Sequence, residues 1–123
     1  MSKIVQAVNA MIAKPDAITD VIPASAADRD ELFFLYDRKY KWSIMKTPAD
    51  DYLLYYYPGD QSIEVLAAMD EEWNTFNQYV HYSTKDLGTK EARQTFAELF
   101  GIVKERRYDM DKVLDKIIRD VPF

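Results

Sequence analysis

The sequence predicts an α+β domain in which a four-stranded, mainly antiparallel sheet packs with about four helices. Three observations carry this prediction. Apolar residues recur at helical spacing in the first 13 positions, and they alternate with period two between Glu31 and Tyr57. Helical spacing then returns after Gly88. We therefore expect the element order α-β-β-β-α-β-α-α within a single domain that spans residues 1–123.

The first helix is expected over residues 2–13, with Ser2 as its N-cap. Pro15 ends it, because the residue before a proline is disfavoured in helical geometry. Between residues 16 and 30 the apolar positions are interrupted by Pro23 and by a run of small residues. We expect a loop there, with one short turn of helix.

Three strands are expected next, over residues 31–36, 40–46 and 51–57, joined by tight turns at 37–39 and 47–50. If Lys46 and Asp51 are the last paired residues of their strands, Ile44 opposes Leu53 and Trp42 opposes Tyr55. The resulting uniformly apolar face is the predicted main core. It holds Leu32, Phe34, Tyr36, Tyr40, Trp42, Ile44, Leu53, Tyr55 and Tyr57.

The opposite face is apolar with a polar insert, and it allows two interpretations. A helix can cover it, because amphipathic helices must bury their apolar sides. Alternatively, it is an interaction surface or the floor of a pocket, where tyrosine contributes a large apolar area and a polar tip. The candidate partner- or ligand-binding residues on this face are Lys41, Met45, Tyr52, Leu54 and Tyr56.

The remaining elements follow from capping residues and periodicity. Asp60 is expected to cap a helix that extends to about Trp73, and residues 76–83 alternate as a one-sided strand. Gly88 and Thr89 open a long helix, and Asp109 caps the last one. The apolar positions of that last helix are Met110, Val113, Leu114, Ile117, Ile118 and Val121.

Gly101 lies in the middle of the long helix, away from its apolar stripe. Glycine at such a position costs about 1 kcal/mol relative to alanine. Either the helix tolerates this cost, or another backbone, such as that of a second subunit, approaches closely at this point. The sequence leaves both explanations open.

The sequence excludes several kinds of chemistry. With no cysteine and with His81 as its only histidine, this chain cannot supply a structural zinc site or a two-histidine metal site. No serine lies in a Gly-x-Ser-x-Gly elbow, and the isolated glycines form no phosphate-binding loop. We therefore predict no metal, no cofactor and no catalytic residue. Hydrolysis by paired carboxylates stays open, because such residues need not be near in sequence.

Charge and composition restrict the classes of partner that the protein is expected to bind. A net charge of −5 and a pI of about 4.8 disfavour binding to nucleic acid. No apolar run has transmembrane length, and we expect a cytoplasmic protein without membrane contact. The predicted function is a non-enzymatic protein-interaction module, which self-associates or inhibits a basic partner. The alternative is a small-molecule-binding protein with an aromatic pocket between sheet and helices.

Overall fold

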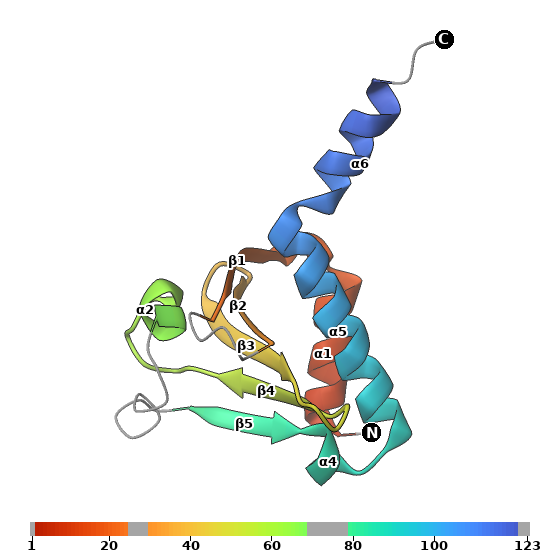
Figure 1. Cartoon of the computed structure of the whole chain (residues 1–123). Helices are drawn as coiled ribbons and strands as arrows, with labels where there is room; N and C mark the ends of the chain where they lie inside the picture. Colours follow the sequence, from red (N-terminus) through yellow and green to blue (C-terminus); the bar gives the residue numbers. More distant parts are fainter. Residues whose placement is uncertain (1, 25–29, 69–78, 121–123) are drawn as a thin grey trace.

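The computed structural model describes residues 2–24, 30–68 and 79–120, and its centre is one antiparallel sheet of five strands (Figure 1). The α+β class is confirmed, whereas the predicted sheet is one strand short. The strands follow one another across the sheet as β1 (Ile18–Pro23), β2 (Glu31–Tyr36), β3 (Tyr40–Lys46), β4 (Tyr52–Tyr56) and β5 (Val80–Ser83). The helices of the described residues are α1 (Lys3–Ala13), α2 (Ile63–Ala68), α4 (Thr84–Leu87), α5 (Lys90–Tyr108) and α6 (Met110–Arg119), with a 3-10 turn at Pro15–Ala17.

Strand β1 occupies the segment for which we expected a loop, and that prediction is wrong. β1 pairs with β2, and its register shifts between Thr19 and Ile22. At this bulge Asp20 has a positive φ of 56°. An inserted residue breaks the period-two alternation from which a strand is identified. The apolar residues of β1 consequently pack on both sides of the sheet.

Helices α1 and α5 cover one face of the sheet and enclose the main core (Figure 1). Their beginnings are as predicted. The Oγ of Ser2 accepts a hydrogen bond from the Val5 amide, and the Oγ1 of Thr89 accepts one from the Ala92 amide. The buried residues of this core are Val8, Met11, Ile18, Leu32, Phe34, Ile44, Tyr52, Leu54, Phe96, Leu99, Phe100 and Val103.

The turn between β2 and β3 is as predicted, but the connection between β3 and β4 is longer than predicted. Ile44 pairs with Leu54 and not with Leu53, which shifts the register of β4 by one residue. The connection contains Asp50 at a φ of 62° and closes with a 2.8 Å hydrogen bond from the Thr47 amide to the Asp51 carbonyl. Because side chains alternate along a strand, this slip exchanges the two predicted faces of β4.

The second face of the sheet is partly covered by α2. Phe33 and Tyr57 pack there with Ile63, Leu66 and Ala67 of this helix. The Oγ of Ser62 accepts a hydrogen bond from the Val65 amide, so Ser62 caps α2 and not Asp60 as predicted. The expected extension of this helix to Trp73 and the first part of the expected strand, at 76–78, lie outside the described residues.

Helix α6 continues beyond α5 and projects away from the sheet (Figure 1). The two helices meet at Asp109, whose φ of 53° and ψ of 50° are left-handed. Its side chain makes no cap hydrogen bond, contrary to our expectation, and lies 3.3 Å from the Lys112 ammonium. Among the helices of the described residues, none combines the length and the apolar composition needed to cross a membrane.

Candidate functional site

The five predicted binding residues do not share one face. Leu54 has no exposed surface, and Tyr52 is 9% exposed with its ring 5.7 Å from that of Phe100 in α5. Tyr56 is half-buried, 4.9 Å from the ring of Trp42. The register places these three side chains on the side of the sheet that α1 and α5 cover.

Lys41 and Met45 occupy the opposite face. The Lys41 ammonium donates to the backbone carbonyls of Gly59 and Gln61, and so fixes the connection between β4 and α2. The predicted common surface is therefore wrong, because the register slip divides its members. Binding of a partner by the individual residues stays a prediction.

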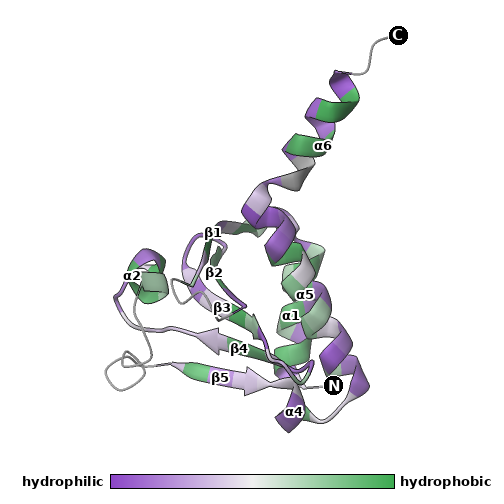
Figure 2. Cartoon of the chain, viewed as in Figure 1, coloured by the Kyte–Doolittle hydropathy of each residue, from purple (hydrophilic) through white to green (hydrophobic). Residues whose placement is uncertain are grey.

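Among the described residues, four exposed apolar side chains follow one another at helical spacing in α6. Val113, Leu114, Ile117 and Ile118 are between 42% and 66% exposed. Figure 2 shows hydrophobic segments, in green, along the projecting helix α6. Lys112, Asp115, Lys116 and Arg119 of the same helix are also exposed. Contiguous exposed apolar side chains of this kind mark interaction sites.

A mainly apolar groove of about 420 Å³ lies where the start of α1 crosses the sheet. Its walls come from Ile4 and Ala7 of α1, Trp42 of β3, Tyr82 of β5 and Leu87 of α4. Ser2 and Lys3, both exposed, complete the lining. This groove is a mixed aromatic and aliphatic site between sheet and helices.

The Nε1 atom of Trp42 is buried and has no hydrogen-bond partner among the described residues. An indole N–H can only donate, so its requirement is a single acceptor. Leaving a buried donor without an acceptor costs about 1–3 kcal/mol. Most buried polar groups in proteins are paired, and this exception lies in a residue that lines the groove.

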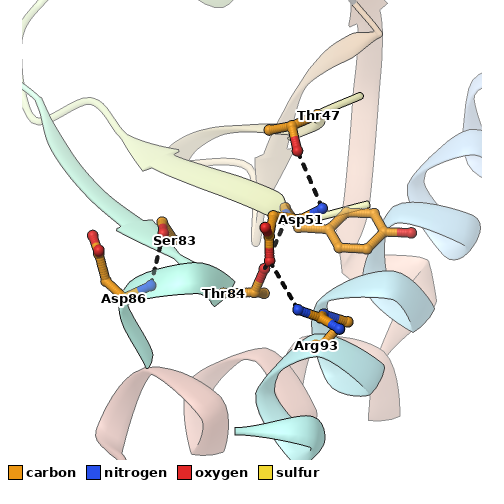
Figure 3. A network of polar contacts seen from close by, with 7 residues as sticks. Thr47, Asp51, Ser83, Thr84, Asp86 and Arg93 are labelled. Carbon is orange, nitrogen blue, oxygen red and sulfur yellow. Dashed lines mark hydrogen bonds and ion pairs between the residues drawn. The ribbon is translucent and has the colours of Figure 1, made fainter. Parts of the chain in front are cut away.

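A polar network joins β4, α4 and α5 (Figure 3). The Asp51 carboxylate accepts from the Thr84 hydroxyl at 3.0 Å and lies 3.3 Å from the Arg93 guanidinium. The same hydroxyl accepts from the Tyr52 amide at 2.9 Å. Beside it, a cavity of about 560 Å³ is bordered by Lys85, Lys90 and Arg93. Because the donors and acceptors of the network are paired with one another, we interpret it as a structural contact that holds β4, α4 and α5 together.

A second polar group is buried on the other face of the sheet. The Ser43 hydroxyl donates to the Glu31 carboxylate at 2.8 Å and lies 2.8 Å from the Tyr57 hydroxyl. All three residues are buried, and Ser43 is fully enclosed. A substrate cannot reach this hydroxyl without unfolding its surroundings, so the arrangement is not a nucleophilic site. Sequence reasoning missed Glu31 because a carboxylate at the start of a strand is normally solvated.

His81 is exposed on β5, where its ring lies 5.6 Å from that of Tyr55 and 6.2 Å from that of Tyr79. This is an aromatic cluster. Over residues 2–24, 30–68 and 79–120, no three histidine or acidic side chains are grouped closely enough to hold a metal ion. Comparison with known proteins adds no relative, because no family model, curated protein or solved structure matches the chain.

Proposed function

We propose that this protein is a non-enzymatic interaction module that self-associates through the apolar side of α6. The observation that carries the proposal is the exposure of four aliphatic side chains on a helix that projects from the sheet. Full burial of one such side chain contributes about 1.5–3 kcal/mol. Four side chains that are roughly half exposed therefore supply several kcal/mol for each copy that is buried.

The charges of the chain favour a protein partner over a lipid surface. Helices that lie on membranes are rich in Lys and Arg on their polar side. The sequence of α6 instead combines two acidic residues, Asp111 and Asp115, with three basic ones, Lys112, Lys116 and Arg119. An acidic protein is moreover repelled by anionic lipid, so a second protein surface is the better match.

Two features favour a second copy as that partner. Residues 1–103 contain ten Lys and Arg against sixteen Asp and Glu, whereas residues 104–123 contain six against five. Two acidic copies therefore repel each other least through their C-terminal segments. In addition, the last turn of α6 is basic. In an antiparallel pair, this turn lies beside the Asp109 end of the other copy. A two-fold pair is also the commonest form of homo-oligomer.

Sedimentation velocity tests the proposal. We expect a reversible dimer in the unmodified protein and a monomer in the Leu114→Gln/Ile117→Gln variant, which removes two apolar contacts and keeps residues of good helix propensity. The matched control is Lys112→Gln/Lys116→Gln. Its dissociation constant should stay within about tenfold of the unmodified value, because exposed ion pairs contribute about 0–1 kcal/mol each.

Two results would reject self-association through α6. One is an unmodified protein that stays monomeric at the highest concentration reached. The other is a dimer that persists in Leu114→Gln/Ile117→Gln. A monomer would direct the search to a different protein that binds the same stripe, which is a separate hypothesis.

A second candidate function is small-molecule binding, and the groove beside α1 favours it. Its volume of about 420 Å³ falls within the range of roughly 300–1,000 Å³ typical of ligand sites. Its mainly apolar lining fits the usual composition of such sites.

A further inference from the structure

The cavity between α4 and the start of α5 has a basic lining. Its volume is about 560 Å³, and Lys85, Lys90 and Arg93 border it. The rest of the lining comes from Thr84, Gly88, Thr89 and Gln94. Among the described residues, the lining thus contains three basic side chains and no carboxylate. In a chain with a net charge of −5, this cavity is a local exception.

Two consecutive helices place the three basic residues around one space. Lys85 belongs to α4, whereas Lys90 and Arg93 are three residues apart in α5 and therefore share one side of that helix. Gly88 joins the two helices in left-handed geometry, with a φ of 69°. A Cβ built on Gly88 meets only the Lys85 carbonyl, at 4.0 Å. No other described atom therefore crowds this connection.

The basic residues differ in whether they already have a partner. Arg93 contacts the Asp51 carboxylate at 3.3 Å through one nitrogen, Nη2 (Figure 3). A guanidinium has five N–H donors, so the others can still bind a ligand. Lys85 and Lys90 are exposed and form no hydrogen bond or ion pair with a described residue. These two lysines therefore bring two positive charges to the cavity that no described carboxylate contacts.

The lining favours one class of ligand over others. The basic side chains repel a cation, and a purely apolar molecule finds no aliphatic or aromatic side chain in the lining. An anion accepts short, charge-assisted hydrogen bonds from Lys and Arg. A phosphate ester suits a cluster of three such residues, because its phosphate carries between one and two negative charges and three acceptor oxygens.

The size of the cavity and the charge around it restrict the ligand further. Its volume lies within the range of roughly 300–1,000 Å³ typical of small-molecule sites, so it holds a phosphate together with a body. A polar body fits, because the Gln94 amide offers both donors and an acceptor. A longer polyanion would extend beyond the cavity and meet Asp86 and Glu91, which are exposed and directly follow the two lysines in the chain.

We infer that this cavity binds a small phosphate monoester with a polar body, such as a sugar phosphate. Lys85 and Lys90 bind the phosphate oxygens. Arg93 donates to the same phosphate through the nitrogens that Asp51 does not contact, and the body lies toward Gln94. The inference goes beyond the proposed function, and it is independent of α6 and of the groove beside α1.

Titration of the full chain with glucose 6-phosphate tests this inference. The pH is about 7.5, where the phosphate is mainly doubly charged, and sodium chloride keeps the ionic strength constant. The readout is the backbone amide resonance of Gly88 in a ¹H–¹⁵N correlation spectrum. Gly101 is the internal reference, because it lies in α5 outside the cavity. We expect a saturable shift for Gly88 and none for Gly101.

Two control ligands separate the contributions of phosphate and body. Glucose has the same body without the phosphate, and we expect it to leave the Gly88 resonance in place. Inorganic phosphate has no body, and we expect it to bind about fivefold more weakly than glucose 6-phosphate, the effect of one lost hydrogen bond.

Three variants at exposed positions test the contacts by calorimetry. Lys85→Gln/Lys90→Gln should weaken binding of glucose 6-phosphate about tenfold. The matched control, Lys112→Gln/Lys116→Gln, removes the same charge from α6 outside the cavity, and its affinity should stay within about twofold of the unmodified value. Gln94→Leu should weaken binding of glucose 6-phosphate and leave binding of inorganic phosphate unchanged. All variants should keep the far-ultraviolet circular dichroism of the unmodified protein.

The inference is overturned if glucose 6-phosphate produces no saturable shift at Gly88, or if inorganic phosphate binds as tightly as the ester. It is also overturned if the two double-lysine variants lose affinity equally. These outcomes do not bear on α6, whose role is decided by the sedimentation experiment. A protein that dimerises without binding glucose 6-phosphate would retain the interaction function and lose this ligand site.

Discussion

Tyr52 and Tyr56 lie four residues apart on the same side of β4, yet their surroundings differ. Tyr52 is in the main core with its ring near Phe100, and its backbone amide donates to the Thr84 hydroxyl. Tyr56 is half-buried beside Trp42. At this scale, the degree of burial decides whether a tyrosine serves stability or remains accessible to a partner.

We expect Tyr52→Ala to lower the free energy of unfolding by about 3–5 kcal/mol, the usual cost of removing a large aromatic side chain from a core. Tyr40→Ala is the control, because Tyr40 is 40% exposed, and its cost should be below about 1 kcal/mol. Urea denaturation measures both values. Equal losses in the two variants would contradict the placement of Tyr52 in the core.

Gly101 lies in the middle of helix α5, although glycine has a low helix propensity. A Cβ built on Gly101 meets no atom within 4 Å, and the residue is exposed. None of the described residues therefore approaches this position closely, which favours simple tolerance of the glycine. Gly88, at the end of α4, is different because its φ of 69° is left-handed and suits glycine.

Gly101→Ala should raise the free energy of unfolding by about 0.5–1 kcal/mol, because alanine loses less backbone entropy in a helix. Gly88→Ala should lower it by about 1–2 kcal/mol, the cost of left-handed geometry for a residue with a Cβ. Guanidinium denaturation of the pair gives both signs. If Gly101→Ala instead weakened the dimer, a second subunit would approach α5 at this point.

The elements differ in how far the sequence determined them. β2 and β3 were predicted to the residue, because alternating apolar positions and a tight turn agree there. β1 was not predicted, because the bulge at Asp20 interrupts the alternation of side chains along the strand. The register of β4 was predicted wrongly because both faces of this strand are apolar. The pattern of apolar residues therefore does not distinguish one face from the other.

The candidate surfaces were harder to predict than the strands. The amphipathic pattern of α6 is plain in the sequence, but we assumed that every helix packs on the sheet, and its exposure follows from the left-handed junction at Asp109. The groove depends on where α1 crosses β3 and β5, which is set by tertiary packing. A pocket between sheet and helices was the alternative expectation, but none of the five residues named for ligand binding lines this groove.

In the molecule as a whole, the core and the proposed interface belong to different segments. Among the side chains that the structure describes, the buried residues of both core clusters come from α1, α2, α5, the strands and Tyr57, and none of them comes from residues 112–119 of α6. The sheet and its covering helices therefore do not require α6 for their packing. The proposed interface can change without disturbing the core.

A chain that ends at Asp109 should fold with a melting temperature that does not depend on protein concentration. The full chain should instead melt at a higher temperature as its concentration rises, because dimerisation stabilises the folded state by mass action. Scanning calorimetry over an about hundredfold concentration range measures both. A concentration-dependent melting temperature in the shortened chain would place the interface outside α6.

The two outer strands of the sheet have a further consequence. β1 carries a bulge and ends at Pro23, and β5 is only four residues long. Short, bulged or proline-containing outer strands resist the addition of another strand, which is how β proteins avoid aggregation and fibre growth. Contact between copies through these strands is thereby disfavoured. The outer strands therefore disfavour an open-ended array built by strand addition, which is compatible with the proposed helix-mediated pair.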